Sequence, residues 1–305
     1  MSDIFNILLL QNTLRTATPV VLCALGCLMT DQVGIMNIGV DGMMLMGAFF
    51  AVLGSYLFSS WLMGLVFAVV LGILLGLFYY VFSIRFKSDE FIIGVALNIL
   101  AGGLTVFLLR TLFGVKGSFS GPGIVPLPTL TLPGIRDIPV LGPILSGNTL
   151  LVYVSWLLVL LCWLFLYKTP IGFHLRASGE APEALRASGK SPERMKRLAS
   201  VLCGILATVS GAHLSLGYLT MFSENMSASR GYVAVACVIF GGGNPPRVFL
   251  AALMFGFIDA LGMRLQKYIS SDLTSMAPYV VTVVMMVAVV LLRRRKQAAR
   301  ERLSA

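Results

Sequence analysis

Few residues in this 305-residue sequence have side chains that could carry out catalytic chemistry. Its two histidines, His174 and His213, belong to no HExxH zinc motif and to no Ser/His/Asp arrangement. The run GKS at 189–191 matches the end of a GxxxxGK[ST] phosphate-binding loop, but Ala184 stands where that loop needs its first glycine. The five cysteines lie in apolar segments and suggest packing. The sequence therefore predicts no enzyme, no metal site and no ATP site of its own.

Polar residues that interrupt apolar runs are the better candidates for function. The run GIMNIGVDG at 34–42 contains Asn37, Gly39, Asp41 and Gly42 between two apolar stretches. Broken helices often carry the substrate region of transporters, and irregular backbone at membrane depth must face protein or a water-filled cavity. The run is therefore either part of a translocation pathway or its gate, or a cytoplasmic turn that fixes helix packing. Asp41 is the leading residue for both, because an ionisable group near a bilayer seldom lacks a partner.

Three further polar residues are candidates for the pathway. Asn98 lies in an apolar stretch near Gly94 and Gly102, where small residues favour close helix contact and an amide usually bonds to another helix. Asn225 belongs to a short polar run between apolar stretches. Asp259 is the most isolated acid in any apolar segment, and either pairs with a donor on a neighbouring helix or lines the pathway.

The composition shows which elements must position these residues. Hydrophobic residues make up 57% of the chain and charged residues 12%, with a mean hydropathy of +0.90. A soluble domain has about 25% charged residues. The predicted fold class is thus an all-α polytopic membrane protein with a single transmembrane domain over 1–305. The net charge of +10 does not indicate nucleic-acid binding, because the charges lie in the loops.

The apolar stretches predict about nine transmembrane segments, one of them short or broken, because a crossing needs about 20 residues. Residues 1–15 mix apolar and polar side chains and predict an interfacial helix. The Pro- and Gly-rich segment 113–148 predicts an external loop, and 293–305 a basic tail. The expected crossings are 16–30, two within 42–84, 91–109, 149–167, 198–219, the short 232–240, 248–267 and 276–292.

The basic residues indicate the orientation. On one side lie the loop around 85–90, the segment 168–197, Arg247 and the C-terminal tail, which together hold 16 of the 23 Lys and Arg residues. Cytoplasmic loops carry the excess of basic residues. We therefore expect segment 168–197 and the C-terminus in the cytoplasm, and the N-terminus outside.

Segment 168–197 predicts a short helix of about two turns, near 181–188. Pro182 suits a first helical turn, and Glu183 lies where a helix N-terminus favours a carboxylate. A second helix is expected to begin at Pro192. The segment is either an ordinary cytoplasmic loop or the docking site of a cytoplasmic protein. The candidate docking residues are Gly179, Glu180, Pro182, Glu183, Ala184, Arg186 and Gly189, and a second cytoplasmic turn contains Gly241, Asn244 and Pro245.

These stretches resemble one transporter family. The short helix with Pro-Glu-Ala between two glycines resembles the coupling loop of ABC-transporter permeases. Residues 34–48, GIMNIGVDGMMLMGA, resemble the N-[IL]-G-[IV]-[ED]-G-M-M signature of permeases for branched-chain amino acids, simple sugars and nucleosides. Residues 225–245 are similar to a second block of that family. The stretch FIIGVALNILAGGLTVFLLR and the short N-terminus are closest to the nucleoside-type permeases.

The resemblance implies a type II ABC importer permease of a bacterial plasma membrane, which transports nucleosides. It also implies a second homologous permease, a cytoplasmic ATPase that binds the ATP, and an external lipoprotein that binds the substrate. Simple sugars such as ribose, or branched-chain amino acids, remain as alternative substrates. An ion-coupled secondary transporter is the alternative of another class, with Asp259 as its strongest intramembrane acid.

Overall fold

Apolar stretches of about 20 residues form the long helices of this computed structural model, which describes residues 7–131, 142, 146–266 and 280. Within these residues, seven helices are long and apolar enough to cross a membrane, and one further apolar helix is shorter. The expected crossing at 276–292 and the tail at 293–305 lie outside the described residues, apart from Val280. The helices are α1 (Ile7–Asp31), α2 (Val40–Phe58), α3 (Trp61–Tyr80), η1 (Val81–Arg85), α4 (Glu90–Phe113), α6 (Leu150–Lys168), α7 (Pro170–Glu180), α8 (Pro182–Ala187), α9 (Pro192–Ala212), η2 (His213–Leu219), α10 (Arg230–Gly241) and α11 (Pro245–Leu265).

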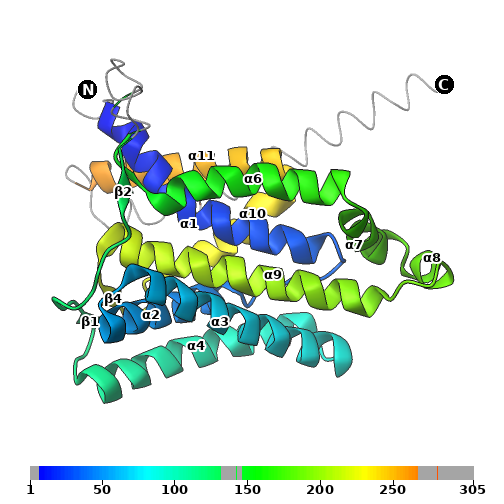
Figure 1. Ribbon diagram of the computed structural model, residues 1–305, viewed down its shortest axis with the longest axis horizontal. Coiled ribbons are helices and arrows are strands. Elements are labelled where there is room, and N and C mark those ends of the chain that lie inside the picture. Colours follow the sequence, from blue (N-terminus) through cyan, green and yellow to red (C-terminus); the bar gives the residue numbers. More distant parts are fainter. Residues whose placement is uncertain (1–6, 132–141, 143–145, 267–279, 281–305) are drawn as a thin grey trace.

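Helices α1, α2 and α9 form the centre of the bundle, and α3, α4, α6 and α11 lie around it (Figure 1). The central helices are largely buried by protein, whereas only about a third of each surrounding span is buried, as expected for helices that face lipid. Small residues allow the tight crossings. A Cβ on Gly211 of α9 would collide with the backbone of Met44 in α2, so only glycine fits there.

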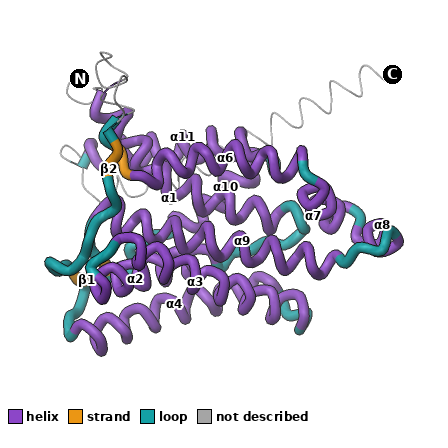
Figure 2. The backbone as a smooth tube through the Cα atoms, viewed as in Figure 1, coloured by secondary structure: helices purple, strands orange, loops and turns teal. Residues whose placement is uncertain are grey.

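Two ends of the molecule differ in structure (Figure 2). At one end α7 and α8 project beyond the spanning helices (Figure 1). At the other end lie four two-residue strands: β1 (Ser118–Phe119) pairs with β4 (Phe222–Ser223), and β2 (Thr129–Leu130) pairs with β3 (Asn148–Thr149). The described residues at 114–131 and 146–149 form turns, loops and these short strands.

The N-terminal segment corrects one prediction. Residues 7–15 do not form a separate interfacial helix, because α1 continues without a break to Asp31. Arg15, one of the polar residues that suggested an interfacial position, and the next residue, Thr16, have partners inside the protein. Arg15 donates a hydrogen bond to the Gly147 carbonyl at 2.9 Å, and Thr16 donates to the Gly256 carbonyl at 2.9 Å. These hydrogen bonds satisfy the polar groups of Arg15 and Thr16, so this part of α1 can pack inside the bundle.

Prolines mark the helix starts at the α7–α8 end. Pro182 and Pro192 occupy the first positions of α8 and α9, as expected, and Gly189 has a φ of +76°, a conformation that favours glycine at a helix stop. One boundary differs from expectation. Gly179 and Glu180 do not flank α8 directly but end the preceding helix, α7.

Candidate translocation site and coupling surface

The short helix α10 begins inside the thickness of the membrane domain. Its 12 residues span about 18 Å, well short of a bilayer core of about 30 Å. Its C-terminal end lies at the α7–α8 end of the molecule, because the Gln32 side-chain amide donates to the Gly243 carbonyl at 3.1 Å. The chain reaches its first residue, Arg230, from β4 at the opposite end. Helix α10 is thus a half-helix whose N-terminus points into the bundle.

Asp41 occupies that N-terminus. One carboxylate oxygen accepts a hydrogen bond from the backbone N–H of Gly231 at 3.0 Å, and the other accepts from the Ser227 hydroxyl at 3.1 Å. Ser229, the residue at the N-cap position, makes no side-chain hydrogen bond to the helix, so a residue of α2 serves as the cap of α10. A carboxylate is favoured there because free N–H groups and the helix dipole give the N-terminus a partial positive charge. Asp41 is buried, with 9% exposed.

A glycine allows this contact. A Cβ on Gly231 would lie 2.5 Å from the Cα of Asp41, so the backbones of α10 and α2 touch directly. The close approach explains why the helix N-terminus is capped from another helix.

Asn98 of α4 joins the same region through three hydrogen bonds. Its side-chain oxygen accepts from the Gly42 N–H at 2.7 Å, and its nitrogen donates to the Ile38 carbonyl at 3.1 Å and to the Tyr232 hydroxyl at 2.8 Å. Asn98 therefore links the start of α2 to α10. Tyr232 is 42% exposed, so a half-exposed aromatic ring with a polar tip borders this site.

Arg230 and Asp259 form an ion pair beside Asp41. The guanidinium of Arg230 lies 3.1 Å from the Asp259 carboxylate, with 20% and 28% of the two side chains exposed. Of the two interpretations of Asp259, pairing with a neighbouring helix is what the structure shows. A carboxylate that is already paired with arginine is poorly suited to bind a coupling ion.

The other residues of the 34–42 run hold the turn before α2. The Asn37 side-chain oxygen accepts from the Gly39 N–H at 2.9 Å, and Asn37 is only 3% exposed. A Cβ on Gly39 would meet Gly94 of α4 at 3.2 Å. The packing interpretation therefore describes Asn37 and Gly39, while Asp41 and Gly42 belong to the polar site itself.

The site includes residues that the sequence pattern did not single out. Ser227 and Tyr232 enter through contacts with Asp41 and Asn98, which lie more than 100 residues away in the chain. Asn225 is exposed, and its side chain makes no hydrogen bond to Asp41 or Asn98 in the described structure. Gly102 also differs from expectation, because a Cβ there would meet nothing within 4 Å.

Helix α8 forms an exposed surface at the opposite pole from the strands. Arg186 binds Glu183 at 2.8 Å and also pairs with Glu193 at the start of α9. The hydrogen bond to Glu193 raises the pKa of the Arg186 guanidinium above its ordinary value, so the bridge keeps its charge. Ala184 is exposed, whereas Leu185 is buried against the bundle. The helix therefore has a fixed position and a free outer face.

The α7–α8 unit contacts the turn that leads to Asp41. A Cβ on Gly179 would lie 2.5 Å from the Gln32 carbonyl and 3.0 Å from the Gly34 nitrogen, so α7 rests on the backbone of that turn. Gln32 in turn binds Gly243 in the turn formed by Gly241, Asn244 and Pro245. The 32–34 turn thus contacts both the end of α7 and the turn at 241–245.

No group of three or more potential metal ligands occurs among the described residues. The site instead offers amide, hydroxyl, carboxylate and aromatic groups at the N-terminus of a half-helix, in the arrangement typical of transport pathways.

Comparison with known proteins identifies the family. Residues 9–290 match the family described as branched-chain amino acid transport system / permease component. The chain belongs to this permease family. It is therefore a multi-pass membrane subunit of an ABC transporter and not an enzyme, because ATP hydrolysis belongs to a partner subunit.

Individual relatives cover most of the chain. It is 32% identical to the guanosine ABC transporter permease protein NupQ of Bacillus subtilis, over 92% of both chains. It is 30% identical to the nucleoside ABC transporter permease protein NupC of Lactococcus lactis, over 90% of both. It is 32% identical to TsgC13 of Haloferax volcanii, provisionally named a glucose ABC transporter permease protein, over 85% of this chain and 78% of that one. No solved structure matches the chain.

Proposed function

We propose that this permease forms half of the translocation pathway of an ABC importer for nucleosides. The observation that carries the proposal is the similarity to guanosine and nucleoside permeases over nine tenths of both chains. The polar site at the N-terminus of α10 fits this class of substrate. Amide and hydroxyl groups can bond to ribose and base, and the half-exposed Tyr232 ring beside Asn98 offers a stacking surface.

The proposal includes three partners. A second homologous permease would complete the pathway. Two relatives support this, because B. subtilis and L. lactis each have a second permease, NupP and NupB, that is 24% identical to this chain and is named for guanosine or nucleosides. A cytoplasmic ATPase that binds ATP would dock on the exposed face of α8. An external lipoprotein would deliver the substrate at the strand-bearing end.

The proposed orientation places α7 and α8 in the cytoplasm and the N-terminus outside a bacterial plasma membrane. The distribution of basic residues supports it, since the topology predicted from the sequence places 16 of the 23 on the side of segment 168–197. Closure of the ATPase would then move α8, and the contact between Gly179 and the 32–34 turn would carry that movement toward Asp41.

Uptake of radiolabelled guanosine into proteoliposomes tests the proposal, with this chain reconstituted together with its partner permease, ATPase and binding protein. We expect ATP-dependent uptake that unlabelled adenosine and uridine reduce and ribose does not. A simple sugar is the second candidate, because the glucose-type relative is also 32% identical. Strong competition by ribose or glucose, with none by nucleosides, would move the assignment to sugars, and competition by leucine would move it to branched-chain amino acids.

A further inference from the structure

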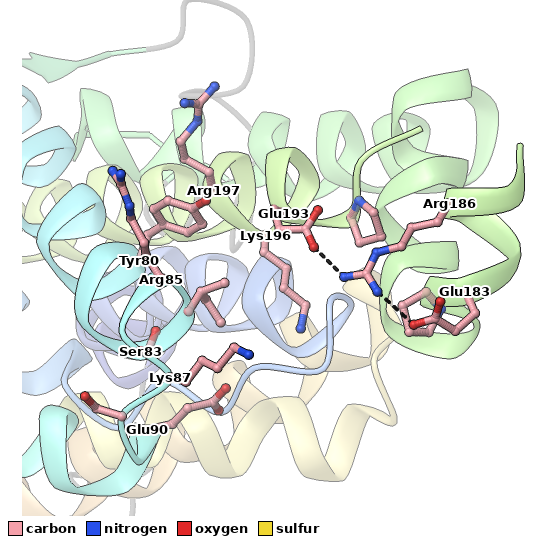
Figure 3. Close-up of a pocket in the computed structure, with 14 residues that line it drawn as sticks. Tyr80, Ser83, Arg85, Lys87, Glu90, Glu183, Arg186, Glu193, Lys196 and Arg197 are labelled. Atoms are coloured by element: carbon pink, nitrogen blue, oxygen red, sulfur yellow. Dashed lines mark hydrogen bonds and ion pairs between the residues drawn. The ribbon is translucent and has the colours of Figure 1, made fainter. Parts of the chain in front are cut away.

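A charged pocket of about 780 Å³ lies at the α8 end of the molecule, outside the polar site described above (Figure 3). One wall comes from the end of α3, from η1 and from the loop that follows it. The other wall comes from α8 and the first turns of α9. The volume is in the range of pockets that hold small ligands or headgroups.

The pocket has an excess of uncompensated positive charge. Its lining holds five cations, Arg85, Lys87, Arg186, Lys196 and Arg197, and among them only Arg186 forms an ion pair with another described residue. In Figure 3 the Lys87 and Lys196 side chains extend from opposite walls toward the middle of the pocket. The pocket is therefore electrostatically suited to an anion.

The three acids that line the pocket are already engaged. Glu183 and Glu193 both bind Arg186, and Glu90 accepts a hydrogen bond from the Met36 N–H at 2.9 Å. None of these carboxylates pairs with the other four cations, and the five cations of the lining outnumber its three acids by two, so a positive excess remains.

The backbone at this pocket is held in an unusual conformation. Residues 81–85 form a π-helical turn, a feature that often occurs at functional sites. Lys87 has a φ of +54°, uncommon for a residue other than glycine, and the next residue, Ser88, donates its N–H to the Phe82 carbonyl at 3.2 Å. Such a backbone conformation costs free energy, and it persists where the surrounding structure holds it in place. Here this conformation places Lys87 on the pocket wall.

The position of the pocket favours a ligand from the membrane. Tyr80 and Ile84 line it, and both belong to the α3–η1 segment, which is one of the candidate spans. Phe78 and Phe82 of the same segment, and Phe86 directly after it, are exposed, as expected at the boundary between lipid and water. The pocket thus lies where a candidate span ends, between that span and α8.

We propose that this pocket binds the headgroup of an anionic phospholipid of the phosphatidylglycerol type. The phosphate would lie between Lys87 and Lys196, so one lipid would bridge the η1 loop and α9 next to the coupling surface. Basic pockets between spanning helices recognise such headgroups in other membrane proteins. The inference does not depend on the transported substrate.

Native mass spectrometry of the purified full-length chain tests the proposal, by titration with phosphatidylglycerol or phosphatidylcholine of identical acyl chains. We expect the chain to retain phosphatidylglycerol preferentially. The double variant K87Q/K196Q should bind it roughly thirtyfold more weakly, the effect of removing two cations at a headgroup. K87R/K196R keeps both charges and should bind as the parent does, and neither variant should change the binding of phosphatidylcholine.

The matched control is K190Q/R194Q, which removes two charges from the same end of the molecule without touching the pocket. It should retain phosphatidylglycerol. The proposal is overturned if the control loses as much affinity as K87Q/K196Q, or if the parent binds both lipids equally. Displacement of the lipid by millimolar inorganic phosphate would also overturn it, because the site would then select a soluble anion.

Discussion

At the scale of single residues, Asp41 connects two helices through hydrogen bonds that nothing else in the described structure replaces. Replacement by alanine would leave the Gly231 N–H and the Ser227 hydroxyl without their acceptor in a buried setting. Such losses cost about 1–3 kcal/mol for each buried group left unpaired. We expect Asp41→Ala to lower the melting temperature of the purified protein and to abolish uptake.

Ser227→Ala provides the comparison, because it removes the hydroxyl and leaves the bond to Gly231 intact. We expect a smaller loss of stability from Ser227→Ala, and in the double variant less than the sum of the two single losses, since the residues interact directly. Purely additive losses would show that the hydrogen bond between Asp41 and Ser227 does not contribute to stability.

At the scale of elements, the start of α2 packs directly against α4 because Gly42 has no side chain. A Cβ on Gly42 would lie 2.8 Å from the Asn98 oxygen and 2.9 Å from its Cα, whereas a Cβ on Gly102 of α4 meets nothing within 4 Å. Gly42→Ala should push α2 away from α4, and overpacking of this kind costs about 1–3 kcal/mol. Thermal unfolding in detergent measures the difference, and we expect Gly102→Ala to match the parent or to melt slightly higher. Equal destabilisation by both substitutions would contradict the close contact.

The contact between α7 and the 32–34 turn predicts a defect in coupling. A Cβ on Gly179 would collide with the Gln32 carbonyl, so Gly179→Ala should separate the coupling surface from the turn that leads to Asp41. In proteoliposomes with all partners, we expect ATP hydrolysis to continue while substrate uptake per ATP falls severalfold. Lys190→Ala, an exposed change in the loop after α8, serves as the control. Parallel loss of hydrolysis and uptake would indicate failed assembly in place of failed coupling.

The sequence predicts most of these elements because their signals are local. Long apolar runs indicate the spans, and Pro182, Pro192 and Pro245 mark the helices that begin there. The interfacial position predicted for residues 1–15 is wrong for 7–15, because the partner of Arg15 lies 132 residues away. Helix α7 was missed, although Thr169 before Pro170 is a start signal and accepts a hydrogen bond from the Gly172 N–H at 3.1 Å.

The same distinction applies to the polar site. Asp41, Asn98 and Asp259 could be selected individually, because polar residues in apolar runs are conspicuous. Their meeting at the N-terminus of α10 could not be predicted, since the contacts join residues 29 to 190 positions apart. Ser227 has no local signal that separates it from the other serines of its loop.

At the scale of the whole molecule, the orientation in the membrane can be tested through the cysteines. All five native cysteines are buried, so a membrane-impermeant maleimide should label the parent protein poorly. Ser188 after α8 and Lys116 near β1 are both exposed and lie at opposite ends of the bundle. In intact cells, we expect the reagent to label Lys116→Cys and to label Ser188→Cys only after the cells are made permeable. The reason is the excess of basic residues at the α8 end, which retains that end in the cytoplasm during insertion. Labelling of Ser188→Cys in intact cells, with Lys116→Cys protected, would show the opposite orientation. Helix α8 would then lie outside the cell, where a cytoplasmic ATPase could not reach it.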